Sequence, residues 1–477
     1  MPHDSYQLHP PPSVAHTINR SAAANHSHPQ ARTCGVPKGL KEADARAHRE
    51  KSQQRPQRKR VRVLRALGLG LITGAADDDP SAIGTYAAAG AKLGPSFLWM
   101  APVTLPMMVA VVYLSSKVGQ VSGKGLFGLM RDVYPRWILY VTLVGVLIGN
   151  TIEAAADIGG MSAALELLVP VPPGYLVAAV ALTVLSLQIF ASYRFIRNVF
   201  RLLALALLAY VVAAFLAKPD IGAVVKGTLI PTIRFDSEFL SLLVAVIGTT
   251  LSAYLYTWQS NQEVEERIAA GHRRLKDRQG ASNSEMKQTL VDVICGMVFS
   301  NIIMYFIVLA TAATLFKAGQ HDINTAADAA KALVPLAGKA AGLLFTLGVI
   351  GVGFLAVPVM TTGAAYDLAQ TMGWKHSLNA KPLQARAFYG AITVFTLIAM
   401  LMNFLGINPM RALVWAGIVQ GFSTPPLMLL IMLMTSSRKV MGKHANSRSM
   451  NILGWITTAA IFAASIALFV SWFLPRK

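Results

Sequence analysis

Long apolar stretches recur along most of this chain, and they restrict its fold more than any other feature. About 20 apolar helical residues cross a hydrocarbon core of about 30 Å, and stretches of this length alternate here with short polar segments. Only 14% of the 477 residues are charged and 54% are hydrophobic, whereas a soluble domain carries about a quarter charged residues. We therefore predict an all-α polytopic membrane protein whose apolar surface contacts the lipid bilayer.

The apolar stretches predict eleven transmembrane helices. With the N-terminus inside, the segments between these helices place 33 Lys and Arg residues on the inner side and 10 on the outer side. This bias is typical of inner-membrane topology, so we expect a multi-pass protein of the cell inner (plasma) membrane with a cytoplasmic N-terminus. The predicted spans are residues 63–91, 95–116, 137–168, 174–192, 198–217, 238–266, 286–316, 338–371, 385–405, 409–435 and 451–474.

Residues 1–60 contain no long apolar run and are predicted to be a disordered, basic cytoplasmic tail, followed by a transmembrane domain over residues 61–477. The basic run at residues 51–65 fits RNA or a nuclear import receptor, but an anionic inner leaflet beside the first span explains it better. We therefore expect no nucleic-acid partner, although the net charge is +20. The two cysteines predict neither a disulfide framework nor a metal site, and no oligomeric state follows from the sequence.

The first span contains the segment ITGAADDDPSAIGTY, residues 72–86, with three carboxylates in an apolar setting. Pro80 removes a backbone donor and disrupts the preceding turn, and in lipid the freed carbonyl groups need partners. A break here predicts a bound cation or a water-filled cavity, with Asp79 as the buried functional carboxylate. Asp77 and Asp78 are expected to face a vestibule. The alternative is a capped helix start at the surface.

The sixth span repeats this theme around Gly248-Thr249-Thr250-Leu251-Ser252, where small and hydroxyl residues lie in mid-span. Broken helices at corresponding positions of two five-helix halves are typical of inverted-repeat transporters. We therefore predict a LeuT-like inverted repeat (5+5 helices) plus one extra helix. Its parts are a first repeat at about 63–217, a second at about 238–435 and the extra helix at about 451–474.

Polar residues on other spans are open to two interpretations. Glu153 and Asp157 share one helical face, where they either line a cation or proton path or pair with polar groups inside the bundle. Gln259 either orients a hydrated ion or bridges two helices. Asp367 receives no role. The carboxylates that end the sixth span are expected to be solvated rather than to form an inner vestibule; they are Glu263, Glu265 and Glu266.

These features resemble the Nramp family of divalent-metal transporters over residues 63–474. The family's first-helix motif Asp-Pro-Gly-Asn supplies two metal ligands, and here Asp79-Pro80 matches its first half. Its sixth-helix motif Met-Pro-His supplies a thioether and a proton-linked histidine. The resemblance implies a backbone carbonyl ligand at Thr249 and a counterpart of the family's third-helix glutamate at Asp157. The eighth span, residues 345–370, is also similar to the family.

The departures from the family motifs bear on the metal. Ser252 stands at the methionine, and without sulfur an all-oxygen site suits Mg²⁺ and Mn²⁺ better than softer metals. Ala82 stands at the asparagine and leaves room for a hydrated ion. Tyr254 stands at the histidine and is a poor proton relay, which leaves Asp157 as the candidate proton carrier. The pattern resembles the Nramp-related magnesium transporter branch.

We therefore expect a divalent cation transporter working by alternating access, with Mg²⁺ favoured, Mn²⁺ a close second and no permanently bound cofactor. The alternatives are a transporter of a small organic solute with the same fold and a non-transporting membrane receptor. No catalytic motif indicates an enzyme. The predicted metal ligands are Asp79, Thr249 and Ser252; the residues predicted to line the path or surround the site are Asp77, Asp78, Ala82, Glu153, Asp157, Thr250, Tyr254 and Gln259.

Overall fold

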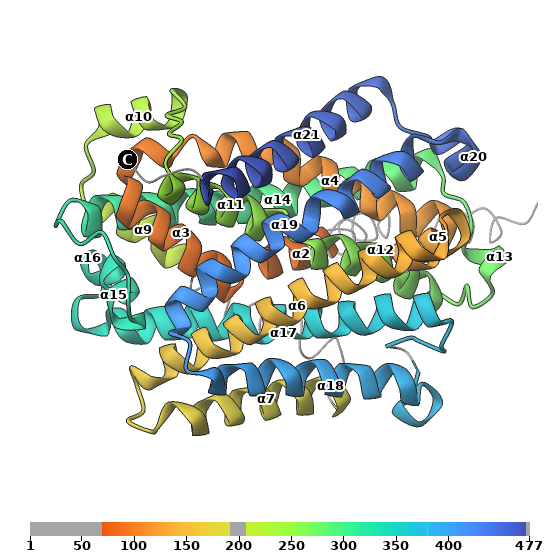
Figure 1. Cartoon of the computed structure of the whole chain (residues 1–477), viewed down its shortest axis with the longest axis horizontal. Helices are drawn as coiled ribbons and strands as arrows, with labels where there is room; N and C mark the ends of the chain where they lie inside the picture. The colour runs from red at the N-terminus through yellow and green to blue at the C-terminus, as the bar shows by residue number, and fades with distance from the viewer. Residues whose placement is uncertain (1–68, 191–206, 379, 474–477) are drawn as a thin grey trace, which may run out of the picture. The chain divides into compact units, whose positions relative to one another are not determined.

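The computed structural model describes residues 69–190, 207–378 and 380–473, which all belong to one compact unit, residues 62–477. Within these residues every regular element is a helix (Figure 1). Nine helical segments of the described residues are long and apolar enough to cross a membrane. The predicted tail, residues 1–60, lies outside the described residues.

The helices that make up the predicted spans follow the order predicted from the sequence. They are α2 (Leu69–Asp77), α3 (Pro80–Leu93), α4 (Met100–Ser122), α6 (Arg136–Glu166), α7 (Pro173–Phe190), α9 (Leu208–Leu216), α11 (Ser237–Thr250), α12 (Ala253–Ala269), α14 (Asn283–Thr311), α17 (Ala341–Met372), α18 (Arg386–Met402), α19 (Pro409–Ser436) and α21 (Arg448–Ser471). The short connecting helices are α5 (Leu126–Val133), α10 (Ile221–Leu229), α13 (Leu275–Arg278), α15 (Ala326–Ala330), α16 (Val334–Ala337) and α20 (Arg438–Met441).

Four predicted spans reach beyond the described residues. Residues 63–68 of the first, 191–192 of the fourth, 198–206 of the fifth and residue 474 of the last lie outside them, and α9 is the described helix of the fifth. The total of eleven helices therefore stays a prediction. The boundaries of the two repeats stay predictions as well.

The second span is displaced from its predicted position, residues 95–116. Gly94 adopts a positive φ of 62° and opens a 3-10 turn through Phe97, so α4 begins only at Met100. The helix then continues past the polar Lys117, which is buried and donates to the Asn446 side chain. It ends at Gly123, whose left-handed conformation (φ 67°) closes the helix. Hydropathy alone ended the span too early because the partner of Lys117 lies far along the chain.

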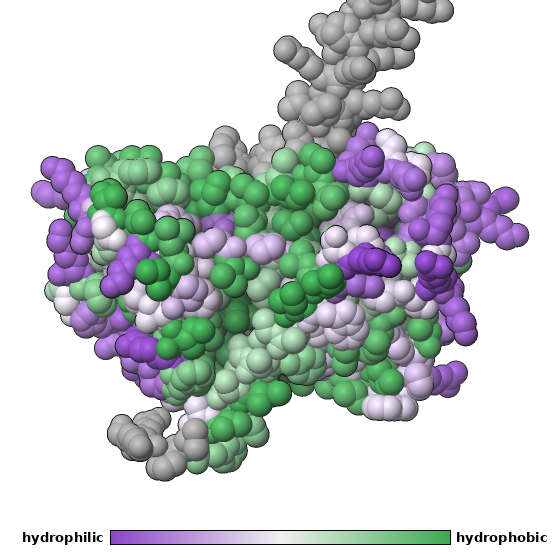
Figure 2. Space-filling model, turned by 90° about the horizontal axis from the view of Figure 1, so that it is seen from above, coloured by the Kyte–Doolittle hydropathy of each residue, from purple (hydrophilic) through white to green (hydrophobic). Residues whose placement is uncertain are grey.

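The helices pack in pairs that join the two predicted halves of the chain. α6 lies along α17, and α7 lies along α18 (Figure 1). The α2 segment packs against α14, and α12 packs against α4. The α11 and α19 helices, which both belong to the second half, also pack against each other. Hydrophobic side chains cover the middle of the face seen in Figure 2, and hydrophilic side chains gather at both ends. This distribution fits a unit that crosses a bilayer.

Glycines allow α11 and α19 to approach closely. A Cβ atom on Gly248 would overlap the carbonyl oxygen of Gly417 and lie 2.5 Å from the amide nitrogen of Gly421. Gly248 is also four residues before Ser252, where the sixth span breaks. The contact therefore fixes the half-helix that leads into this break.

We expect Gly248→Ala to lower the free energy of unfolding by about 1–3 kcal/mol, because the added methyl group has no room between α11 and α19. Thermal unfolding of the detergent-solubilised protein measures the change. Gly390→Ala on α18 is the matched control, because nothing lies within 4 Å of its added Cβ, and it is expected to be neutral or slightly stabilising. Equal melting temperatures for the two variants would contradict the close contact.

Candidate functional site

The first predicted break is present between α2 and α3. The α2 segment ends at Asp77, Asp79 is extended (φ −62°, ψ 170°), and Pro80 begins α3. Proline suits this first helical position because no hydrogen bond is lost there. The Asp79 Oδ1 atom accepts a hydrogen bond from the amide nitrogen of Ala82 at 2.6 Å. Asp79 therefore caps α3, as a surface helix start would be capped, but it is fully buried.

The second break is narrower than predicted. The α11 helix continues through Thr250, and only Leu251 and Ser252 separate it from α12. The Ser252 hydroxyl lies 2.8 Å from the carbonyl oxygen of Gly248 and 2.9 Å from that of Thr249. It thus reaches back to carbonyl groups at the end of α11 that have lost their helical partners.

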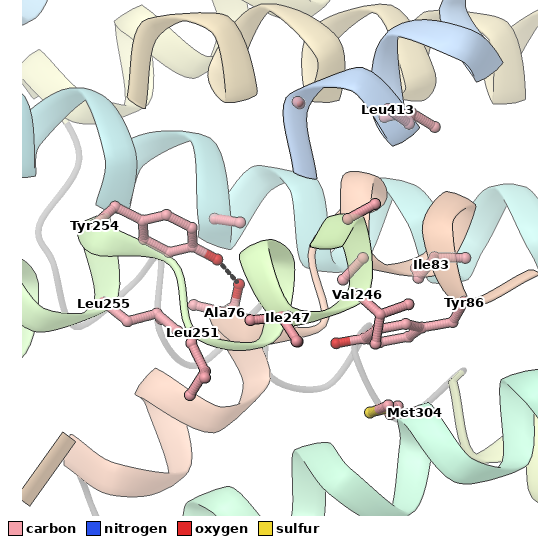
Figure 3. Close-up of a cluster of buried hydrophobic side chains, with 14 of the residues drawn as sticks. Ala76, Ile83, Tyr86, Val246, Ile247, Leu251, Tyr254, Leu255, Met304 and Leu413 are labelled. Carbon is pink, nitrogen blue, oxygen red and sulfur yellow. Dashed lines mark hydrogen bonds between the residues drawn. The ribbon is translucent and has the colours of Figure 1, made fainter. Parts of the chain in front are cut away.

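Tyr254 on the first turn of α12 joins the two breaks. Its hydroxyl oxygen lies 2.9 Å from the carbonyl oxygen of Ala76 at the end of α2 (Figure 3). The same oxygen lies 2.8 Å from Asp79 Oδ2. Tyr254 is fully buried, so these two acceptors depend on this one hydroxyl. Tyr254, which stands at the position of the histidine in the Nramp motif, therefore links the second helix break to the first.

Two carboxylates of α6 complete this arrangement. Asp157 Oδ1 accepts from the amide nitrogen of Ser81 at 2.9 Å. Glu153 Oε1 lies 3.2 Å from the Ser81 hydroxyl and 3.3 Å from the Ser252 hydroxyl. The interpretation that both residues pair with polar groups inside the bundle thus describes their contacts, and these groups belong to both breaks. We call the resulting group the break cluster: Asp79, Ser81, Glu153, Asp157, Ser252, Tyr254 and Gln420.

Gln420 of α19 belongs to the break cluster, but sequence analysis missed it. Its side-chain nitrogen donates to Glu153 Oε2 at 2.6 Å and lies 3.2 Å from Asn150 Oδ1. The available signal was a lone amide in an apolar span between Gly417 and Gly421. Such a residue cannot be assigned to a site without knowing which helix faces it.

Asp77 and Asp78 lie on a different side of the break, against α14. The Ser300 hydroxyl lies 2.5 Å from Asp77 Oδ2 and 3.2 Å from Asp78 Oδ1. Both aspartates are fully buried, so the expectation that they face a vestibule is wrong for this conformation. Neither Asp77 Oδ1 nor Asp78 Oδ2 has a hydrogen-bonding partner among the described residues. Ser300 was also missed, because a serine in an apolar helix is common.

Four further predicted residues surround the breaks. The Thr249 hydroxyl bonds back to α11 at the Ala245 carbonyl oxygen (3.1 Å), so only its own carbonyl group is directed to the break. The Thr250 hydroxyl donates to Val246 and lies 3.5 Å from the hydroxyl of Tyr86. The Ala82 side chain is buried and offers no donor or acceptor. Gln259 bridges helices, accepting from Thr73 at 2.5 Å and donating to Ser116 at 2.8 Å.

A cavity of about 450 Å³ opens at the end of the unit where α12 is followed by α13, which we call the α13 end. Glu263 and Glu266 line it together with Gln120 and Asp292. Glu263 and Glu265 are only 7% and 6% exposed, so the expectation of solvated helix-end charges is wrong for both. Glu263 Oε2 accepts from Gln120 at 2.8 Å, which holds the carboxylate at the cavity wall.

The charge of the break cluster is not balanced by basic side chains. Among the described residues, no Lys or Arg forms an ion pair with its carboxylates. The described part of the chain also contains no three His, Cys, Asp or Glu side chains arranged to hold a metal ion together. The carboxylates of the break cluster are contacted by backbone N–H, hydroxyl and amide groups of the protein.

Comparison with known proteins decides the family. Residues 70–471 match the family described as Nramp, natural resistance-associated macrophage protein-like. The chain belongs to the Nramp family. The resemblance inferred from Asp79-Pro80 and the sixth span is therefore confirmed.

Curated relatives and solved structures agree with this assignment. The divalent metal cation transporter MntH of Deinococcus radiodurans is 26% identical over 408 residues, covering 84% of this chain and 88% of that protein. MntH of Bacillus subtilis is 25% identical over 450 residues, covering 91% and 99%. The fold resembles an Eremococcus coleocola manganese transporter (TM-score 0.69, 16% identity, 86% of each chain) and MhsT in complex with L-phenylalanine (TM-score 0.54, 12% identity, 85% and 98%). The LeuT-like class predicted for this Nramp protein is confirmed.

We expect Tyr254→Phe to lower the free energy of unfolding by about 1–3 kcal/mol, because Asp79 Oδ2 and the Ala76 carbonyl oxygen lose their donor in a buried setting. Chemical denaturation of the solubilised protein measures this loss. Tyr175→Phe is the matched control, since Tyr175 is 73% exposed. If the two variants have the same stability, the hydroxyl of Tyr254 does not hold the breaks together.

Proposed function

We propose that this Nramp protein transports a divalent metal cation by alternating access. The curated relatives carry the name of divalent metal cation transporters. The observation that carries the proposal is the meeting of two helix breaks, at Asp79 and at Ser252, beside two carboxylates of α6. Backbone that leaves the helical ladder inside a membrane protein is typical of ion and substrate sites.

The cation binds between the two breaks. Its ligands are the Asp79 carboxylate, the Thr249 carbonyl oxygen and the Ser252 hydroxyl. Glu153 and Asp157 add negative charge from α6, and the path around the ion includes Asp77, Asp78, Ala82, Thr250, Tyr254 and Gln259. Gln420 joins this set because it bonds directly to Glu153.

Binding exchanges protein hydrogen bonds for metal–oxygen bonds. In the conformation described, Tyr254 contacts Asp79 Oδ2, and Ser252 contacts the Thr249 carbonyl oxygen. A cation at the breaks displaces both hydroxyl hydrogens from these acceptors. The two half-helices are then no longer held to each other through Tyr254, which links occupancy of the site to movement of the breaks.

Mg²⁺ is the favoured substrate and Mn²⁺ a close second. The proposed ligands are all oxygens, which suit hard cations, and Ser252 occupies the position of the family's thioether. Mg²⁺ retains water molecules when it binds, and the small side chains of Ser81 and Ala82 suit a partly hydrated ion. The Mn²⁺ alternative draws on the fold likeness to a manganese transporter.

The ends of the unit differ in a way that fits one step of such a cycle. At the α13 end the cavity lined by Glu263 leads toward the contact between Thr73 and Gln259. At the opposite end Lys92 of α3 forms ion pairs with Glu238, at the start of α11, and with Asp322 at 2.9 Å. The excess of basic residues assigns the α13 end to the cytoplasm, so this conformation is closed outward.

We expect Asp79→Asn and Asp79→Ala to lower cation uptake into proteoliposomes at least about tenfold, because each removes a charged ligand. Asp220→Asn is the matched control. It caps the exposed helix α10, where asparagine serves equally well. Uptake by both Asp79 variants at the wild-type rate would exclude Asp79 from transport. Uptake of amino acids but no metal by the wild type would favour the organic-solute alternative, and no uptake of either would favour the receptor alternative.

We expect Ser252→Met to raise the affinity for Cd²⁺ relative to Mg²⁺ at least about tenfold, because a thioether prefers softer metals. Competition among Mg²⁺, Mn²⁺, Ca²⁺ and Cd²⁺ in a binding assay measures the selectivity. Ser471→Met on α21, whose hydroxyl bonds back to the Leu468 carbonyl oxygen of its own helix, is the control. A strong Cd²⁺ preference of the wild type would contradict an all-oxygen site.

A further inference from the structure

Asp367 of α17 is a buried carboxylate without a function in the mechanism above. Its side chain is fully buried, and neither Oδ1 nor Oδ2 has a hydrogen-bonding partner among the described residues. An ionised carboxylate in such surroundings is costly unless something neutralises it. Ionisable residues inside membrane proteins commonly bind protons or ions for this reason.

One hydroxyl lies beside the Asp367 carboxyl group. It belongs to Thr257 of α12, and it also lies 3.1 Å from the Tyr254 carbonyl oxygen. Its single hydrogen cannot serve both acceptors at once, so an ionised Asp367 has at most one shared donor. A protonated Asp367 needs no such donor and can itself donate to the Thr257 oxygen.

No charged group in the described chain compensates Asp367. None of the ion pairs among the described residues includes Asp367. The titratable residues of the elements around α17 are engaged elsewhere or lie at the surface. On α12, Tyr254 contacts Asp79, Tyr256 the Leu251 carbonyl, Glu263 Gln120, Glu265 Tyr366 and Arg267 the Arg278 carbonyl. On the other elements the engaged residues are Asp77 and Asp78 at Ser300, Glu153 and Asp157 in the break cluster, Tyr86 at Thr250, Lys92 at Glu238, Arg131 at the Gln370 carbonyl, Tyr389 at the Ala380 carbonyl, and Asp328 with Lys331. The residues at the surface are Asp132, Arg136, Tyr140, Glu166, Tyr175, Glu266, Lys339 and Arg386.

We propose that Asp367 is a proton-binding residue that exchanges its proton with the α13 end of the protein. It lies in a polar seam between α12 and α17, formed by Tyr254, Thr257, Asn261 and Glu265 on α12 and by Tyr366, Asp367 and Gln370 on α17. Residues 254, 257, 261 and 265 share one face of α12. Gln259, Glu263 and Glu266, which lead into the larger cavity, lie on the opposite face.

The seam connects Asp367 in both directions. Toward the α13 end, Gln370 donates to Asn261 at 2.5 Å and Tyr366 donates to Glu265 at 2.8 Å. These four residues line a second cavity of about 280 Å³. Toward the break cluster, the Thr257 hydroxyl bonds to the main-chain carbonyl oxygen of Tyr254, and the side-chain hydroxyl of Tyr254 contacts Asp79. The proton leaves Asp367 for water in this cavity, and the carboxylate remains behind until it is reprotonated.

The first test needs no transport. Infrared spectra of the full-length protein in lipid separate the C=O stretch of a protonated carboxylic acid from the carboxylate bands. We expect the wild-type-minus-variant spectrum to contain one acid C=O band for Asp367→Asn and none for Asp220→Asn. Asp367→Glu is the conservative variant and is expected to retain an acid band. A carboxylate band in place of the acid band for Asp367→Asn would overturn the proposal.

The second test rests on the proposed function. Divalent-metal uptake into proteoliposomes is measured over a series of pH values on the α13 side. We expect Asp367→Asn to bind metal normally, whereas the change of its uptake rate with pH is at least about tenfold smaller than in the wild type. Asp367→Glu is expected to restore the pH dependence of uptake. An unchanged pH profile in Asp367→Asn would show that the proton on Asp367 is not exchanged during transport. If the wild type moves no divalent metal, the proposed function fails, while the infrared result still decides whether Asp367 is protonated.

Discussion

The contact between Tyr254 and Asp79 is the interaction on which the rest of the site depends. A carboxylate inside a membrane protein needs hydrogen-bond donors, a proton or a cation, and one hydroxyl from the second broken helix meets that need in the first. The same hydroxyl reaches the Ala76 carbonyl oxygen, which the break in the first helix leaves exposed. Each break therefore stabilises the other, and neither half-helix can move without altering this contact.

The buried carboxylates differ in how fully they are satisfied, and this difference separates their proposed roles. Asp79 receives donors on both oxygens, which suits a site that protein donors close when the cation leaves. Asp77 and Asp78 share the single hydroxyl of Ser300. Asp367 has only the Thr257 hydroxyl beside it, and neither of its oxygens has a hydrogen-bonding partner within the described ranges. The polar residues of α12 lie on two opposite faces of the helix. One face is directed toward the larger cavity, and the other forms the polar seam beside α17.

Much of the fold was predictable because it follows from local properties. Hydropathy located the long helices, and Pro80 with three preceding carboxylates located the first break. The second break, without proline, was located less closely: α11 continues through Thr250, and the Thr249 and Thr250 hydroxyls bond back to carbonyl groups of the same helix. Helix ends set by glycine, such as Gly123 after α4, were missed because Lys117 ended the apolar stretch before the helix ended.

The sequence by itself determined the class of fold, the position of the first break and the candidate carboxylates, because apolar length, proline and intramembrane charge act on their own segment. Only the tertiary structure decided which partners these carboxylates have. Glu153 and Gln420 are 267 residues apart, and Asp77 and Ser300 are 223 apart. The burial of Asp367 also depends on how α17 packs against α12. Such pairings are set by helix packing across the whole unit, and no local pattern in the chain encodes them.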